Sequence, residues 1–275
     1  MKNKLLVIDP QNDFCDIPGA ALPVPGASAD LMRLSHFVAG SADFIHDLIV
    51  TLDTHPQVAI ERVSFWQDSA GKPVAAFTQI TEQDVLEGRY APRDASAGLK
   101  EQVIDYLHTL EAAGRYRLIV WPVHCVLGTK GHAIYAPLAL HIASWEERTQ
   151  RAATKVLKGL NPLTEQYSAI AAEVPMQSDP TTQCNQGLIE RVRPGEGERL
   201  LLAGEAASHC VRATVLDLME VFSAEELART VLLTDCMSPV GGFEAQAEDF
   251  YRQAQSQGVH LASSAQMSAL FKEEC

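Results

Sequence analysis

The sequence predicts an α/β protein with a doubly wound, mainly parallel sheet of about six strands and helices on both faces. Short apolar runs that end in polar residues alternate with segments whose apolar residues recur at helical spacing. This alternation is repeated along most of the 275 residues. It is typical of parallel strands that are joined by right-handed helical crossovers.

The expected strands are short runs that are rich in apolar residues. The first, 5–8, is continuous and ends at Asp9, as expected for a parallel strand that is buried on both faces. The other predicted strands are 47–52, 118–121, 154–158, 199–202, 230–234 and 259–261.

Amphipathic segments between these runs predict the helices. They cover residues 31–40, 97–113, 133–148, 211–222 and 243–255. Residues 56–98 differ, because aromatic residues are scattered there among Gly, Pro and polar residues, with a short helical piece at 82–86. We therefore expect one domain over residues 1–275, with a loop-rich insertion at 56–98 that packs over the sheet.

Composition and charge exclude several classes of protein. The net charge is -13, which disfavours nucleic acid and anionic membranes as partners. No run approaches the roughly 18 apolar residues of a membrane span, and the first apolar run is too short for a signal peptide. The six cysteines are scattered, without a CxxC pair, which predicts neither a disulfide framework nor a cysteine zinc site. We expect a cytoplasmic protein.

Polar residues with chemical potential follow several of the predicted strands. Because the carboxyl ends of parallel strands meet at one edge of the sheet, we expect these side chains to lie together. They are Asp9, Asp53, His55, His124, Lys158 and Cys210. Their convergence favours an active site over the separate structural roles that each could have.

Cys210 stands where a turn of small residues meets the predicted helix 211–222. A helix N-terminus has unpaired N–H groups and partial positive charge, which would lower the pKa of the thiol and favour the thiolate. The alternative is a buried structural cysteine. Likewise, Asp9 could cap a loop, Asp53 and His55 could be surface residues, and Lys158 could be solvated.

Four blocks of the sequence, taken together, resemble the nicotinamidase/isochorismatase-like family of cysteine hydrolases, and its nicotinamidase branch most closely. The first is Ile8-Asp9-Pro10-Gln11-Asn12-Asp13-Phe14, and the second is Asp53-Thr54-His55. The third runs from Trp121 to Gly131, and the fourth combines Lys158-Gly159 and Tyr167-Ser168-Ala169 with the segment 204–211. The resemblance implies the Rossmann-like fold of that family.

The resemblance also implies a catalytic triad. Cys210 would be the nucleophile, Asp9 the general base and later the acid, and Lys158 the cation that orients Asp9. The N–H groups of Ala206 and Cys210 would form the oxyanion hole. In the family this turn contains a cis peptide, which by position falls between Glu205 and Ala206.

A divalent metal is the cofactor that the resemblance implies. Asp53, His55 and His124 would bind it, with zinc as the first choice and iron or manganese as alternatives. Many nicotinamidases have another His soon after the Asp-x-His block, but the segment 56–65 contains none, and Glu61 is a weak candidate to replace it. We expect Cys125, beside His124, to be structural.

The implied activity is hydrolysis of a small amide, with nicotinamide as the best candidate. Phe14, Trp121 and His209 would contact the flat ring of the substrate. Another small amide or a carbamoyl compound is the main alternative. Isochorismate cleavage is disfavoured, because that branch typically lacks the cysteine, and a non-enzymatic interaction domain is a third interpretation. The aromatic residues of the insertion would allow the chain to form a homo-oligomer.

Overall fold

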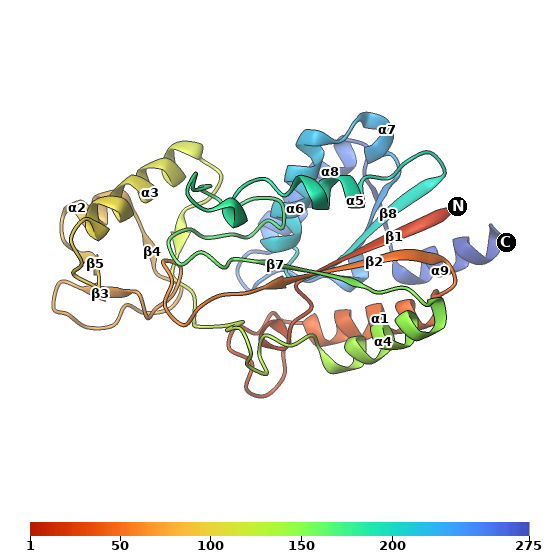
Figure 1. Ribbon diagram of the computed structural model, residues 1–275, viewed down its shortest axis with the longest axis horizontal. Helices are drawn as coiled ribbons and strands as arrows, with labels where there is room; N and C mark the ends of the chain where they lie inside the picture. Colours follow the sequence, from red (N-terminus) through yellow and green to blue (C-terminus); the bar gives the residue numbers. More distant parts are fainter. Residues whose placement is uncertain (275) are drawn as a thin grey trace.

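The centre of the molecule is a six-stranded parallel sheet (Figure 1). A computed structural model describes residues 1–274. The strand order is β10-β9-β8-β1-β2-β7. The bounds are β1 (Lys2–Ile8), β2 (Ile45–Asp53), β7 (Thr154–Lys158), β8 (Glu198–Gly204), β9 (Thr230–Leu233) and β10 (His260–Ala262). This arrangement confirms the predicted α/β fold.

The two central strands bring the first and the last predicted site residues together. The apolar residues 5–8 of β1 are fully buried, as expected for a strand covered on both faces. In the register of β1 with β8, Ile8 pairs with Gly204. The next residues, Asp9 and Glu205, therefore emerge beside each other at the carboxyl edge of the sheet.

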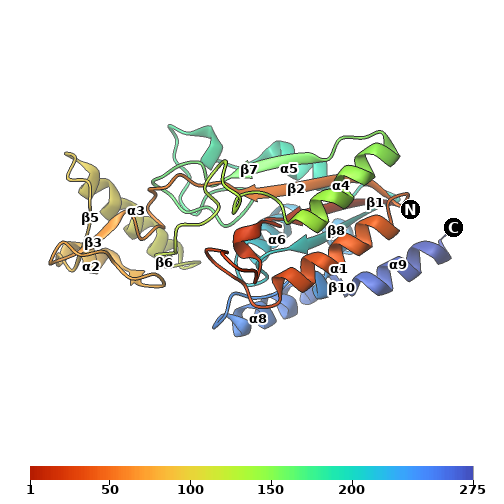
Figure 2. The ribbon, with the colours of Figure 1, turned by 90° about the horizontal axis from the view of Figure 1, so that it is seen from below.

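Helices cover both faces of the sheet (Figures 1 and 2). One face carries α1 (Ala27–Gly40), α4 (Ala136–Thr149) and α9 (Ser264–Glu273). The other carries α5 (Gln186–Val192), α6 (Cys210–Val221) and α8 (Glu244–Ser256), with the short α7 (Ala224–Leu227). Three 3-10 turns lie at Asn12–Phe14, Pro180–Thr182 and Thr234–Cys236. Apolar side chains of the two layers of helices form two cores, one on each side of the sheet.

A smaller lobe extends beyond the carboxyl edge of the sheet, at the left of Figure 1. It consists of β3 (Trp66–Asp68), β4 (Gln79–Ile80), α2 (Glu82–Leu86), β5 (Tyr90–Pro92), α3 (Leu99–Ala113) and β6 (Leu118–Ile119). Its own hydrophobic core includes Trp66, Val103 and Leu107. That one domain spans the chain, with an insertion at 56–98, stays a prediction.

One predicted strand of the main sheet is wrong. Residues 118–121 do not join that sheet, because β6 pairs antiparallel with β4, through Ile80 and Leu118. The reason is that an apolar run indicates burial but not the partner that buries it, and Leu118 and Val120 pack into the core of the lobe. None of the helices in residues 1–274 has both the length and the apolar character needed to cross a membrane.

Candidate active site

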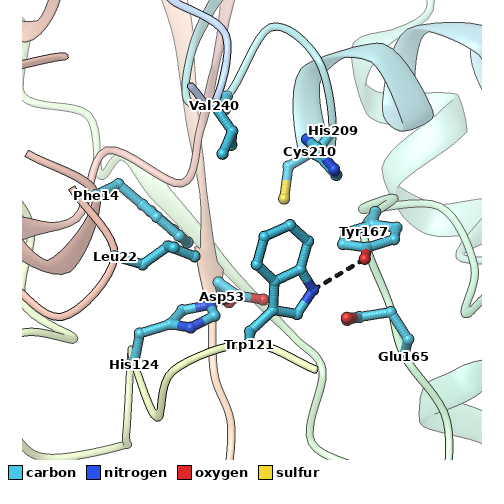
Figure 3. Close-up of a pocket in the computed structure, with 11 residues that line it drawn as sticks. Phe14, Leu22, Asp53, Trp121, His124, Glu165, Tyr167, His209, Cys210 and Val240 are labelled. Atoms are coloured by element: carbon cyan, nitrogen blue, oxygen red, sulfur yellow. Dashed lines mark hydrogen bonds and ion pairs between the residues drawn. The ribbon is translucent and has the colours of Figure 1, made fainter. Parts of the chain in front are cut away.

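Cys210 lies at the start of α6, at the end of a turn that leaves β8 at Gly204. Gly204 has φ 118°, and a Cβ at this position would lie 2.0 Å from Ile8 O, so only glycine fits there. The Glu205–Ala206 peptide is cis, as the resemblance implies. The Cys210 sulfur points into a cavity beside the sheet (Figure 3).

Three backbone N–H groups of this turn, one of them that of Ser208, donate to no acceptor among the described residues. Ala207 N donates to Ser238 O (2.9 Å), and His209 N donates to Ala206 O (3.0 Å). The N–H groups of Ala206 and Cys210 donate to no acceptor among the described residues. This pair can therefore donate hydrogen bonds to an oxyanion.

Asp9 follows β1 and is fully buried beside Cys210. Its backbone adopts φ 45°, which turns the chain sharply at the sheet edge. The Thr51 hydroxyl donates to Asp9 Oδ1 (2.6 Å), and Lys158 Nζ lies 2.9 Å from Asp9 Oδ2. The carboxylate is therefore held in one orientation, next to the thiol.

Lys158, the last residue of β7, connects the cysteine with two carboxylates. Its ammonium lies 2.9 Å from Asp9 Oδ2, 2.8 Å from Asp53 Oδ1 and 3.6 Å from Cys210 Sγ. It also donates to Gln166 O (3.0 Å). The side chain is buried, and the two carboxylates raise its pKa despite the opposing effect of burial.

The expected stabilisation of the thiolate is not present in the resting site. Burial raises the pKa of the Cys210 thiol well above its usual value, and the charges of Asp9 and Asp53 add to this effect. Lys158 lowers it, but does not compensate. Cys210 therefore rests as a thiol, and it needs a base when it reacts.

The three predicted metal ligands lie together at the edge of the cavity. Asp53 Oδ1 is 2.8 Å from His55 Nε2, and Asp53 Oδ2 is 3.4 Å from His124 Nε2. Glu61, the weak candidate from the sequence, is fully buried, with Oε1 3.0 Å from His55 Nδ1. Within residues 1–274, no three or more His, Cys, Asp or Glu side chains are arranged around a common metal position.

The chemistry of this cluster nevertheless fits a divalent cation. Two imidazoles and two carboxylates are a donor set that zinc, iron and manganese accept. Glu61 Oε2 is buried and receives no hydrogen bond from a described donor, which leaves one ligand atom without a partner. A bound ion would replace the contacts that these side chains now make with one another.

Arg62 adds a buried cation to the cluster. Its Nε donates to Glu61 Oε1 (3.0 Å), and its guanidinium also contacts His124 Nδ1. Burial and this guanidinium lower the pKa of His124 to about 4. Burial also disfavours the charged form of His55, but Asp53 and Glu61 outweigh it and raise its pKa to about 9.

A cavity with an empty volume of about 380 Å³, partly open to solvent, lies between these groups. The three residues predicted to contact substrate, Phe14, Trp121 and His209, all line it (Figure 3). The other lining residues are Leu22, Asp53, His124, Glu165, Tyr167, Ala206, Cys210 and Val240.

Glu165 is a cavity residue that the sequence did not predict. Gln166 N donates to its Oε1 (2.8 Å), and its carboxyl group faces the cavity beside Tyr167 and Trp121 (Figure 3). Burial and the charge of Glu61 raise its pKa to about 7. Its only signal in the sequence is that it lies two residues before Tyr167, which belongs to the fourth block of the resemblance.

Comparison with known proteins identifies relatives of the chain. No family model matches it. The nicotinamidase of Escherichia coli (strain K12) is 28% identical over 218 residues, which cover 79% of this chain and 76% of the relative. The nicotinamidase of Saccharomyces cerevisiae is 24% identical over 238 residues, covering 86% and 88%. The predicted resemblance to nicotinamidases is confirmed.

Solved structures of similar fold include yeast nicotinamidase Pnc1p bound to the inhibitor nicotinaldehyde (TM-score 0.63, 20% identity, 96% of this chain and 100% of that one). A pyrazinamidase of Pyrococcus horikoshii in complex with zinc has a TM-score of 0.55 (21% identity, 96% and 99%). An isochorismatase-like hydrolase from Alkaliphilus metalliredigens has a TM-score of 0.52 (17% identity, 98% and 100%). These likenesses support the isochorismatase-like fold.

Proposed function

We propose that this chain is an amidase that hydrolyses a small heteroaromatic amide, with nicotinamide as the first candidate. The observation that carries the proposal is the contact of Lys158 with both Asp9 and Cys210, whose side chain lines an aromatic-walled cavity. The curated relatives, both nicotinamidases, support hydrolysis of a C–N bond. We also propose that the protein is cytoplasmic.

In the proposed reaction, Asp9 takes the thiol proton as Cys210 Sγ attacks the amide carbonyl carbon. The N–H groups of Ala206 and Cys210 stabilise the resulting oxyanion. Asp9 then returns the proton to the leaving nitrogen, the C–N bond breaks, and ammonia departs from a Cys210 thioester. Water, deprotonated by Asp9, attacks the thioester, and the protonated Asp9 returns its proton to Cys210 as the acid product leaves.

Lys158 holds Asp9 in place and balances its charge in both halves of this cycle. Phe14, Trp121 and His209 hold the substrate ring, and their aromatic edges exclude water from the thioester. Asp53, His55 and His124 are the proposed ligands of a divalent metal, and Glu61 is a further donor of this chain. When bound, such an ion supplies a Lewis acid at the edge of the cavity.

A second candidate is an amide whose ring carries an N–H or O–H donor. The Glu165 carboxyl group in the cavity wall favours it, because an acceptor there would pair with such a donor. Ammonia release should be measured with nicotinamide, pyrazinamide and a hydroxylated nicotinamide. Nicotinamide turnover above that of the hydroxylated amide supports the first candidate. Turnover of none of the three, alongside activity on a carbamoyl compound, contradicts it.

The metal site is tested by elemental analysis of the purified protein. We expect the wild type to retain one divalent ion per chain. His124→Ala removes a direct ligand and should weaken binding by more than the roughly 10–100-fold that the loss of a group supporting a ligand costs. His141→Ala, on the outer helix α4, is the matched control and should retain the ion. Equal metal content in the wild type and His124→Ala would contradict the ligand set.

A further inference from the structure

Glu205 is a buried carboxyl group that the proposed reaction does not use. It stands between the end of β8 and Ala206, and its side chain is fully buried. Its backbone N–H donates to Ile8 O (2.8 Å), which fixes its main chain to β1. Its side chain reaches Asp30 of α1 instead of the cavity.

The carboxyl groups of Glu205 and Asp30 are bound by the same residue, because Ser238 N donates to Glu205 Oε2 (3.2 Å) and the Ser238 hydroxyl donates to Asp30 Oδ2. Two buried carboxyl groups that share one serine repel each other when both are ionised, which favours a proton on one of them. Asp30 already accepts hydrogen bonds from Ser238 Oγ and Arg33, as an ionised carboxylate does. Glu205 Oε1 receives no hydrogen bond from any described donor. Glu205 is therefore the protonated partner.

The charges around Glu205 keep that proton in place. Burial, followed by the negative charge of Asp30, raises the pKa of Glu205 well above its usual value. Asp16 adds a second negative charge, and Arg33 is the neighbouring cation but pairs with Asp30. Cys15, Cys236 and Tyr251 are the remaining titratable groups near this pair, and all are neutral at neutral pH because their own pKa values are raised.

Glu205 and Asp30 both bind Ser238, which lies two residues before the cavity residue Val240. Ser238 N donates to Glu205 Oε2 (3.2 Å), and Ser238 O accepts from Ala207 N (2.9 Å). Two residues on, Val240 N donates to Ser208 Oγ (3.0 Å), and the Val240 side chain lines the cavity (Figure 3). The segment 238–240 is thus hydrogen-bonded at three points to the turn that carries Cys210.

We propose that Glu205 is a positioning residue, whose protonated carboxyl group holds the turn 205–210 and the segment 238–240 together. The inference rests on the proposed amidase function. When Glu205 loses its proton to solvent at high pH, two buried carboxylates repel each other at Ser238. The oxyanion N–H groups and Val240 then lose their fixed positions, and turnover falls.

The kinetic test compares Glu205→Gln with Glu205→Leu across pH. Gln cannot ionise, but keeps a donor for Asp30 and an acceptor for Ser238 N. We expect its kcat to lie within about threefold of the wild type at pH 7 and to persist at alkaline pH where the wild type declines. The kcat of Glu205→Leu should be at least tenfold below that of the wild type at every pH. The control Glu173→Gln changes another carboxyl of raised pKa, outside the turn, and should keep the wild-type profile.

An alkaline decline in Glu205→Gln equal to that of the wild type would overturn the proposal, as would wild-type kcat in Glu205→Leu. Infrared spectroscopy provides a readout without turnover. Glu173, whose pKa is raised to about 8, also contributes to the band of protonated carboxyl groups at pH 8, so the comparison is made in a Glu173→Gln background. In that background the band should be present with Glu205 and lost with Glu205→Gln. An unchanged band would overturn the proposal even if Glu205→Leu does not fold. If the protein hydrolyses no amide, the amidase function fails, and the band still decides the state of Glu205.

Discussion

Lys158 makes it possible to bury the carboxylates of Asp9 and Asp53 close together, because both contact its ammonium group. Its ammonium lies within 2.9 Å of an oxygen of each. Without this cation, two carboxylates would face each other in a site from which water is excluded. The same ammonium is 3.6 Å from Cys210 Sγ, so it stabilises the fold and balances the charge of the reacting groups at once.

Replacing Lys158 by Met tests this double role. We expect the free energy of unfolding to fall by about 3–5 kcal/mol, because two buried carboxylates lose their counter-ion. Urea denaturation measures it. Lys155→Met is the matched control from the same strand: Lys155 pairs with Glu146 at the surface, and its loss should cost less than about 1 kcal/mol. Equal losses in the two variants would contradict the role of Lys158.

Glu165 is expected to make substrate binding depend on pH. Its pKa, raised to about 7 by burial and by Glu61, means that it is protonated below pH 7 and ionised above it. When a neutral amide displaces water from Glu165, the ionised carboxylate loses more solvation energy than the protonated carboxyl group does. The KM for such an amide should therefore rise several-fold from pH 6 to pH 8 in the wild type, and stay flat in Glu165→Gln. The same rise in the variant would contradict this assignment.

At the scale of elements, the end of β8 and the start of α6 decide where the nucleophile lies. The pairing of Ile8 with Gly204 brings the ends of β1 and β8 together, so that Asp9 and the turn before Cys210 emerge side by side. This approach is possible only because residue 204 has no Cβ. The oxyanion groups and the base are thus positioned by one strand pair.

Gly204→Ala should therefore disrupt the fold as well as the site. A methyl group at this position would lie 2.0 Å from Ile8 O, and φ 118° is unfavourable for alanine. We expect a loss of about 3 kcal/mol or more in the free energy of unfolding. Gly187→Ala, whose added methyl meets nothing closer than 3.7 Å, should change it by less than about 1 kcal/mol. A wild-type stability for Gly204→Ala would refute the packing described.

At the scale of the whole molecule, the alternating pattern was enough to predict the sheet. Strands such as 5–8 are apolar throughout because helices cover both faces, and this signal is local in sequence. The run 118–121 has the same signal, but is buried in the lobe. Its partner, β4, lies far back in the chain, and a local pattern holds no information about such a partner.

The residues of the site were likewise predictable only where a local pattern of the sequence marks them. Asp9, Asp53 and Lys158 were predictable because each ends a strand of one parallel sheet, and the structure brings their side chains into contact. Arg62 and Glu165 were not, because loops outside the sheet carry Arg62 to His124 and Glu165 to the cavity. Their roles depend on burial beside groups that are remote in sequence, and neither stands at the end of an apolar run.

The most direct test of the central claim, that Cys210 is the nucleophile of an amidase, is ammonia release by Cys210→Ala with the best amide of the substrate panel. We expect turnover to fall by at least about 10⁴-fold, with the melting temperature unchanged. Cys125→Ala is the matched control, because Cys125 is also buried but lies outside the proposed triad, and it should stay within about tenfold of the wild type. Turnover by Cys210→Ala within about tenfold of the wild type would contradict the account.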